Sequence, residues 1–147
     1  MMRVSINKKE KSFLIIGASL CVLSLLYIIV YNLYLRNIDY TNFTLTYGKL
    51  NIFLARPIFY ISLSAIITRS VLLITKYNLP AKLKKYCAYL FTLMLLFYIV
   101  LLLVFFLTVT PEPIYLIATF ILFDSSILFI LLGFLLSLTI QNKKENL

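Results

Sequence analysis

The chain alternates four long apolar runs with short charged segments. The apolar runs cover residues 13–35, 50–75, 86–109 and 114–140. Each run reaches the ~20 residues that a helix needs to cross ~30 Å of hydrocarbon. The first run is longer than a signal-peptide core and no small-residue cleavage motif follows it, so we expect it to be an uncleaved span. The pattern therefore predicts an all-α fold, an integral membrane bundle of four transmembrane helices that form a single domain.

The segments between the runs predict the connections. Residues 36–49 form the longest of these segments and are expected to be an outer loop, in which polar and apolar residues alternate as in a short strand or hairpin. Residues 76–85 carry Pro80 as a turn signal and are expected to form a basic cytoplasmic loop. Residues 110–113, TPEP, predict a tight break before the last span.

Basic residues are distributed unevenly over the two ends of the predicted spans. One set comprises Arg3, Lys8, Lys9, Lys11, Lys76, Lys82, Lys84, Lys85, Lys143 and Lys144, and the opposite set comprises Arg36 and Lys49. Because basic residues are retained on the cytoplasmic side, this asymmetry predicts that both termini are cytoplasmic. We expect a multi-pass protein of the bacterial inner membrane.

Composition excludes several classes of function. The chain of 147 residues is 63% hydrophobic, which leaves no room for a soluble catalytic domain. Histidine is absent and Cys21 and Cys87 are far apart, so we expect no metal, no cofactor and no enzymatic activity. The net charge of +9 is expected to contact anionic lipid head groups, and no basic region with aromatic stacking residues predicts direct nucleic-acid binding.

Three ionisable residues lie inside the predicted spans. Asp124 falls in the middle of the fourth run, and Arg56 and Arg69 fall in the second. Such residues need partners or mark an ion path, so Asp124 is either paired with Arg56 or handles an ion or proton, in which case a ring of Asp124 side chains from several copies would supply the missing ligands. Arg69 lies near the inner end of its run, and we expect its side chain to extend to the inner head groups as an interface cation.

Small residues recur at helical spacing on two of the runs. Gly17, Cys21 and Ser24 form one stripe, and Thr119, Ser126 and Gly133 form another. Small side chains allow helix backbones to approach closely in a membrane, so both stripes predict helix packing.

The span number, the orientation and the basic cytoplasmic faces resemble those of the four-span membrane subunit of the Kiwa anti-phage defence system. That resemblance implies a homo-oligomer in the bacterial inner membrane with a cytosolic DNA-binding partner. We therefore expect a membrane sensor or anchor subunit that docks a cytosolic protein through the basic loop 76–85 and both tails. Two alternatives stay open: a holin-like homo-oligomeric pore or ion channel lined by the fourth span and Asp124, and a small secondary transporter.

Overall fold

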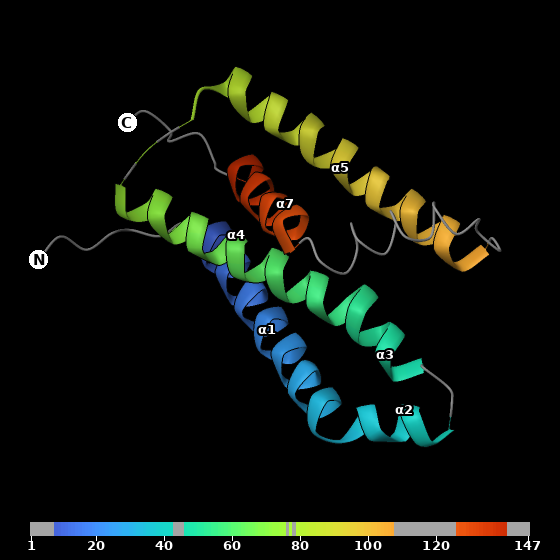
Figure 1. The fold of residues 1–147 in the computed structure, drawn as a ribbon. Helices are drawn as coiled ribbons and strands as arrows, with labels where there is room; N and C mark the ends of the chain where they lie inside the picture. The colour runs from blue at the N-terminus through green and yellow to red at the C-terminus, as the bar shows by residue number, and fades with distance from the viewer. Residues whose placement is uncertain (1–7, 43–45, 76, 78, 108–125, 141–147) are drawn as a thin grey trace, which may run out of the picture.

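The structure, a computed structural model, describes residues 8–42, 46–75, 77, 79–107 and 126–140, and every regular element among them is a helix (Figure 1). In chain order the elements are α1 (Lys8–Val30), the π-helix η1 (Tyr31–Leu35), α2 (Arg36–Asn42), α3 (Thr46–Leu50), the π-helix η2 (Asn51–Ala55), α4 (Arg56–Thr75), α5 (Ala81–Leu107) and α7 (Ser126–Thr139). The expected all-helical architecture is confirmed for the described part of the chain.

Three helical stretches are long and apolar enough to cross a membrane. They cover Lys8–Asp39, Tyr47–Thr75 and Ala81–Leu103, and they correspond to the first three predicted spans. This arrangement is compatible with a multi-pass membrane protein. The helix α7 has 14 residues, and the first part of the predicted fourth span, residues 114–125, lies outside the described residues.

The predicted outer loop is the part of the sequence interpretation that needs the largest correction. The strand or hairpin suggested for residues 36–49 is wrong, because the described residues of this segment belong to α2 and α3. The helix α1 continues through η1 into α2, and α3 continues through η2 into α4. A continuous helix pairs its own backbone amides with its own carbonyls. This matters within a membrane, because no water is present there to bond unpaired backbone groups.

The predicted basic loop 76–85 is also shorter than expected. The helix α4 ends at Thr75 and α5 already begins at Ala81, directly after Pro80. Proline is favoured just ahead of a helix because it fixes the backbone while lacking only an amide that the first turn does not use. The amide of Lys84 donates to the carbonyl of Pro80 at 3.1 Å, which closes this first turn.

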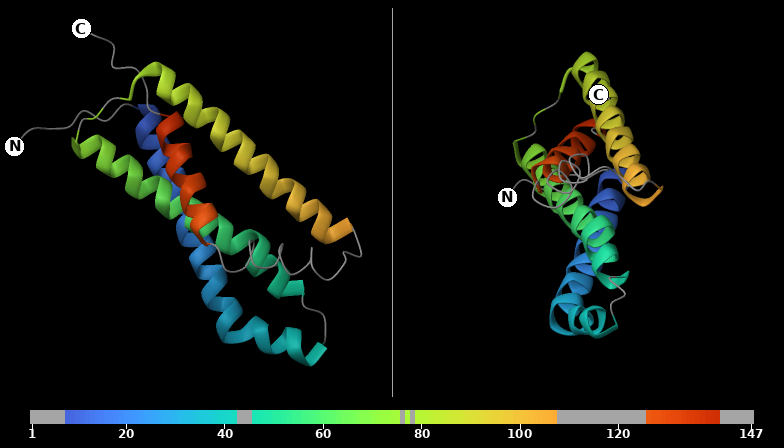
Figure 2. Two further views of the ribbon diagram at one scale, coloured as in Figure 1. Left: turned by 45° about the horizontal axis from the view of Figure 1, so that its top comes forward. Right: turned by 45° about the vertical axis from the view of Figure 1, so that its right-hand side comes forward.

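The helix α4 lies at the centre of the arrangement. It packs against α1 on one side and α7 on the other, and α5 packs against α7. The helices α1 and α4 cross and then separate toward α2 and α3 (Figure 1). Figure 2 shows that α1 and α5 begin at the end of the bundle where α4 and α7 finish. We call this the α1/α5 start, and the end with α2 and α3 the α2/α3 end.

Tyr98 of α5 connects the helices through the core. Pro57 has no amide to donate to the carbonyl of Phe53, four residues earlier, and the hydroxyl of Tyr98 donates to that carbonyl at 2.7 Å. The ring of Tyr98 also meets the ring of Phe129 edge to face, with centroids 5.2 Å apart. Leu132 completes this buried cluster. The proline in α4 is thus accommodated by a hydrogen bond from a neighbouring helix, as is typical of membrane helices.

Gly133 sets the distance between α4 and α7. A Cβ atom at this position would overlap the carbonyl oxygen of Ile61 and lie 2.9 Å from the Cβ of Ser64. The hydroxyl of Ser64 donates to the carbonyl of Ile130 at 2.7 Å across the same contact. The two backbones therefore approach as closely as a glycine permits.

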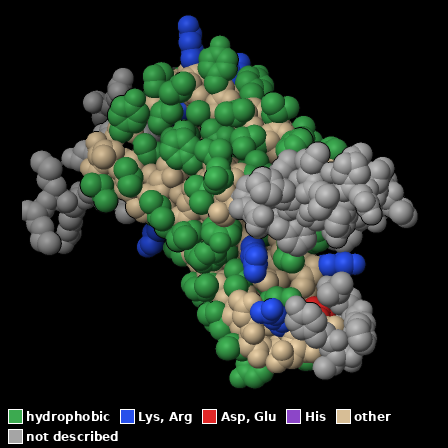
Figure 3. Space-filling model, in the orientation of Figure 1, with side chains coloured by type: hydrophobic (Ala, Val, Ile, Leu, Met, Phe, Trp, Pro, Cys, Tyr) green, Lys and Arg blue, Asp and Glu red, His purple; other side chains and the backbone are tan. Residues whose placement is uncertain are grey.

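Hydrophobic side chains cover much of the described part of the face shown in Figure 3. Large apolar side chains remain exposed along the helices, among them Ile74 at 78%, Leu93 at 66% and Leu23 at 64%. In water such a surface would drive aggregation, whereas in lipid it is the expected boundary of a membrane bundle.

Candidate functional site

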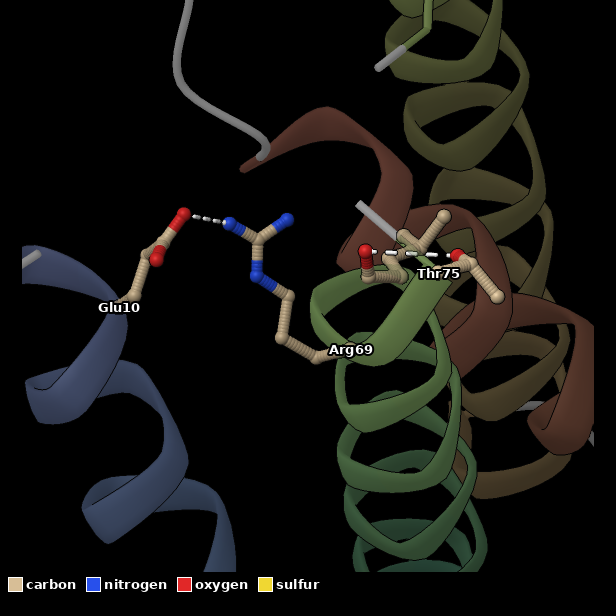
Figure 4. Close-up of polar contacts among 4 residues, drawn as sticks. Glu10, Arg69 and Thr75 are labelled. Atoms are coloured by element: carbon tan, nitrogen blue, oxygen red, sulfur yellow. Dashed lines mark hydrogen bonds and ion pairs between the residues drawn. The ribbon is translucent and has the colours of Figure 1, made fainter. Parts of the chain in front are cut away.

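A buried ion pair joins the first turn of α1 to α4. One guanidinium nitrogen of Arg69, Nη2, donates to Oε1 of Glu10, 59 residues earlier in the chain. Figure 4 shows the two side chains reaching toward each other across the space between their helices. The side chain of Arg69 is 1% exposed and that of Glu10 is 14% exposed. The pair therefore holds α1 and α4 together near the α1/α5 start.

The burial of Arg69 differs from the sequence expectation that this side chain extends to the inner head groups. Its guanidinium is instead enclosed, and its Nε and Nη1 atoms have no hydrogen-bond partner among the described residues. The reason for the difference is that α1 begins at Lys8 and brings Glu10 into a helical turn beside α4. Once enclosed, the guanidinium needs this carboxylate, because a buried charge without a partner is strongly destabilising.

Six lysines lie at the same end of the bundle as this pair, at the α1/α5 start. Lys8, Lys9 and Lys11 lie in the first turn of α1, and Lys82, Lys84 and Lys85 lie in the first turn and a half of α5. All are exposed except Lys84, which is half-buried. We call these six residues the basic face. Among the described residues at this end, Glu10 is the one acidic residue, and it forms an ion pair with Arg69.

The basic face opposes the usual charge preference of a helix start. The first turn of a helix carries a partial positive charge, which favours acidic side chains and disfavours lysine. The helix α5 has no acid in its first turn, and the acid of α1 is Glu10. An external anion would relieve this repulsion, since free amides and lysines at a helix start attract phosphates and carboxylates.

A second buried carboxylate, Asp39, lies at the α2/α3 end. It is 2% exposed, and it accepts hydrogen bonds from the amides of Tyr47 at 3.3 Å and Gly48 at 2.6 Å. These amides belong to the first turn of α3, which has no intrahelical acceptors for them. Asp39 of α2 therefore caps the first turn of α3.

Tyrosines of α1 and η1 enclose this cap. The hydroxyl of Tyr27 donates to the carbonyl of Tyr47 at 3.3 Å. A Cβ atom on Gly48 would lie 3.0 Å from the hydroxyl of Tyr31 and 3.3 Å from Asp39 Oδ2. Tyr27 thus makes a polar contact between α1 and α3.

The predicted small-residue stripes have described members on both helices. Gly17 lies against Ile66 of α4, 3.2 Å from the position a Cβ would take, and Ser24 is 6% exposed. Cys21 lies between them and is half-buried, with a free thiol like that of Cys87. Ser126 is half-buried at the start of α7 and Gly133 contacts α4, while Thr119 lies outside the described residues.

Several predicted site residues fall outside the described part of the chain. They are Asp124, Lys76, Lys143 and Lys144. Arg56 is the first residue of α4 and is half-buried, and its pairing with Asp124 stays a prediction. Within the described ranges, no three His, Cys, Asp or Glu side chains are grouped so that they could hold a metal ion.

Comparisons with protein-family models, curated proteins and solved structures find no match for this chain.

The sequence analysis did not identify four residues that organise the bundle. Glu10 was interpreted as part of a polar tail, and Asp39 as part of a loop. Nothing in the sequence distinguishes Tyr98 from the other residues of the apolar run 86–109. Asn51 is completely buried in η2, and its side-chain amide has no hydrogen-bond partner among the described residues. The helix α1 begins at Lys8, five residues before Phe13, and this extension is what brings Glu10 into a helical turn.

Proposed function

We propose that this chain is a small membrane subunit that acts as a sensor or anchor for a larger bacterial assembly. Three apolar helical stretches provide the membrane attachment, and the basic face provides the docking surface. In this proposal the protein lies in the inner membrane as a homo-oligomer, with both termini and the basic face in the cytoplasm. The positive-inside distribution of its lysines and arginines supports that orientation.

The observation that carries the proposal is the clustering of six lysines on the first turns of α1 and α5, at one end of the bundle. Glu10 is engaged by Arg69, so its charge does not neutralise the neighbouring lysines. Two helix starts add their partial positive charges to the six side chains. The best complement to such a surface is a layer of anionic lipid head groups together with an acidic segment of a cytosolic protein.

The resemblance to the Kiwa membrane subunit supports a role in anti-phage defence and a partner that itself binds DNA. In that arrangement, the membrane subunit contacts the cytosolic protein and needs no nucleic-acid site of its own. An acidic docking segment on such a partner would match the basic face by charge.

The docking experiment compares two sets of substitutions at opposite ends of the bundle. The first variant changes Lys9, Lys82 and Lys85 to Gln, and the control changes Arg36 and Lys49 to Gln. Each lysine near an anionic surface contributes about 1 kcal/mol, so the first variant should lower the recovery of cytosolic partner by roughly tenfold or more. The control should recover as much partner as the wild type. Equal losses in both variants would overturn the docking proposal.

The rival function is a pore lined by the fourth span. The described packing favours the anchor, because Gly133 and Ser137 of α7 are buried, with Gly133 against α4, and do not line an open face. Conductance across planar bilayers should be absent for the reconstituted wild type. A current that Asp124→Asn alters would replace the anchor proposal by the pore.

A further inference from the structure

An apolar cavity of about 220 Å³ lies between α1 and the segment that runs from the end of α3 through η2 into α4. We call it the α1–α4 groove. Its lining residues are Leu20, Leu23, Ser24 and Tyr27 on one side and Leu50, Leu54, Ala55 and Ile58 on the other. Figure 1 shows the reason for its position, since the two helices separate beyond their crossing.

The floor of the groove is formed by small side chains. Ser24 and Ala55 are each 6% exposed and are the smallest of the lining residues. The hydroxyl of Ser24 donates to carbonyls of its own helix, to Leu20 at 2.6 Å and to Cys21 at 3.1 Å. It therefore offers no free donor to the groove. Water needs polar partners to occupy a cavity, so this one is suited to an apolar occupant.

The mouth of the groove opens on the outer apolar surface. Leu20, Leu23, Leu50 and Leu54 are between 43% and 64% exposed, and they continue the surface of two stretches able to cross a membrane. The medium at the mouth is then hydrocarbon. Tyr27 also lines the groove, and its hydroxyl bonds to the carbonyl of Tyr47. An occupant must enter from the side, between the exposed leucines.

The π-helix η2 shapes one wall. It contributes Leu54 and Ala55, and its wider turn changes the direction of these side chains relative to a regular helix. Single π-turns inside longer helices occur frequently at binding sites. A regular α-turn would rotate Ala55 out of register with the groove, because each inserted residue shifts a helical position by about 100°.

We propose that the α1–α4 groove binds one acyl chain of a membrane phospholipid, which stays there apart from the lipids that surround the bundle. An apolar protein cavity of about 150 Å³ is sufficient to bind benzene. The larger groove accepts a segment of a flexible hydrocarbon chain, whose methylenes contact the leucines and whose end lies on Ser24 and Ala55. This inference is independent of the cytosolic partner and of the defence role.

The first test fills the floor of the groove. The variant Ala55→Phe places a large ring where the acyl chain would lie, and Ala18→Phe adds the same ring to an exposed position of α1 as a matched control. The proteins are purified from phosphatidylcholine vesicles, and retained phospholipid is counted by native mass spectrometry. We expect wild type and control to retain one phospholipid per chain, and Ala55→Phe to retain roughly fivefold less. Equal retention in all three proteins would overturn the proposal.

A second test does not depend on filling the groove. The chain has no tryptophan, so a single introduced tryptophan reports on its own surroundings. Leu20→Trp places the reporter at the mouth, and Leu93→Trp places it on the lipid-facing side of α5. In vesicles with a rising fraction of phosphatidylcholine brominated in its acyl chains, the groove reporter should follow single-site quenching and the α5 reporter multiple-site quenching. The same multiple-site curve for both reporters would exclude a distinct acyl-chain site.

Discussion

The two described acidic residues, Glu10 and Asp39, are both enclosed by protein, yet they are stabilised in opposite ways. Glu10 faces a guanidinium from a helix 59 residues away, whereas Asp39 accepts hydrogen bonds from two amides eight and nine residues away. The first arrangement joins two long helices near the α1/α5 start. The arrangement around Asp39 caps the first turn of α3 at the α2/α3 end.

This difference separates global from local stability. Loss of Glu10 would leave the charge of Arg69 enclosed without a counter-charge, and an unpaired buried charge destabilises the whole bundle. Loss of Asp39 would leave two amides of α3 unbonded, and these lie in the first turn of a long helical stretch, where a helix can fray locally. The same carboxylate chemistry thus has two energetic consequences, which substitutions can distinguish.

The largest effect is expected for Glu10→Leu. Removal of one partner from a buried ion pair costs about 3–5 kcal/mol, because the other charge remains buried. The double variant with Arg69→Met should recover most of that loss, since both charges are then absent. Reversible unfolding in detergent micelles with increasing dodecyl sulfate gives the free energies. If the single and double variants are equally unstable, the pair does not join α1 to α4 energetically.

An intermediate effect is expected for Asp39→Ala. Loss of a helix-capping side chain costs about 1–2 kcal/mol. Hydrogen exchange should accelerate at the amides of Tyr47 and Gly48 while the amides of α4 around Arg69 keep their protection. Asp39→Asn serves as the control, because its amide oxygen can still accept one of the two bonds. Faster exchange throughout α4 would show that Asp39 stabilises the whole bundle and not α3 alone.

The smallest effect is expected for Tyr27→Phe. The bond from its hydroxyl to the carbonyl of Tyr47 is 3.3 Å long, so its removal should cost about 0.5 kcal/mol. Tyr34→Phe is the matched control, because that side chain is 66% exposed. The same unfolding measurement applies to both. A loss above that of Asp39→Ala would mean that the tyrosine contact, and not the carboxylate, holds the α2/α3 end.

The hydrophobic pattern predicted the helices well and their ends poorly. Hydropathy indicates which residues contact hydrocarbon, and this defined the first three spans. It does not indicate where backbone hydrogen bonding stops, and so residues 36–42, 46–49 and 81–85 were assigned to loops although they are helical. Pro80 was interpreted as a turn signal, and α5 begins at the next residue.

The candidate site was less accessible to sequence reasoning. A contact between Glu10 and Arg69 depends on how α1 and α4 cross, and a single sequence contains no record of that geometry. The lysines of the basic face were identified because their clustering is visible along the chain. The pairing of Asp124 with Arg56 stays a prediction, since Asp124 lies outside the described residues.

The glycine contact between α4 and α7 also bears on the order in which the chain is made. The ribosome completes α4 well before α7, and α5 is synthesised between them. Until α7 arrives, the carbonyl of Ile61 and the hydroxyl of Ser64 lack the partner helix that covers them in the finished protein. In the incomplete chain the hydroxyl of Ser64 therefore lacks its acceptor on α7, and the packing of α4 can finish only after translation has passed Gly133.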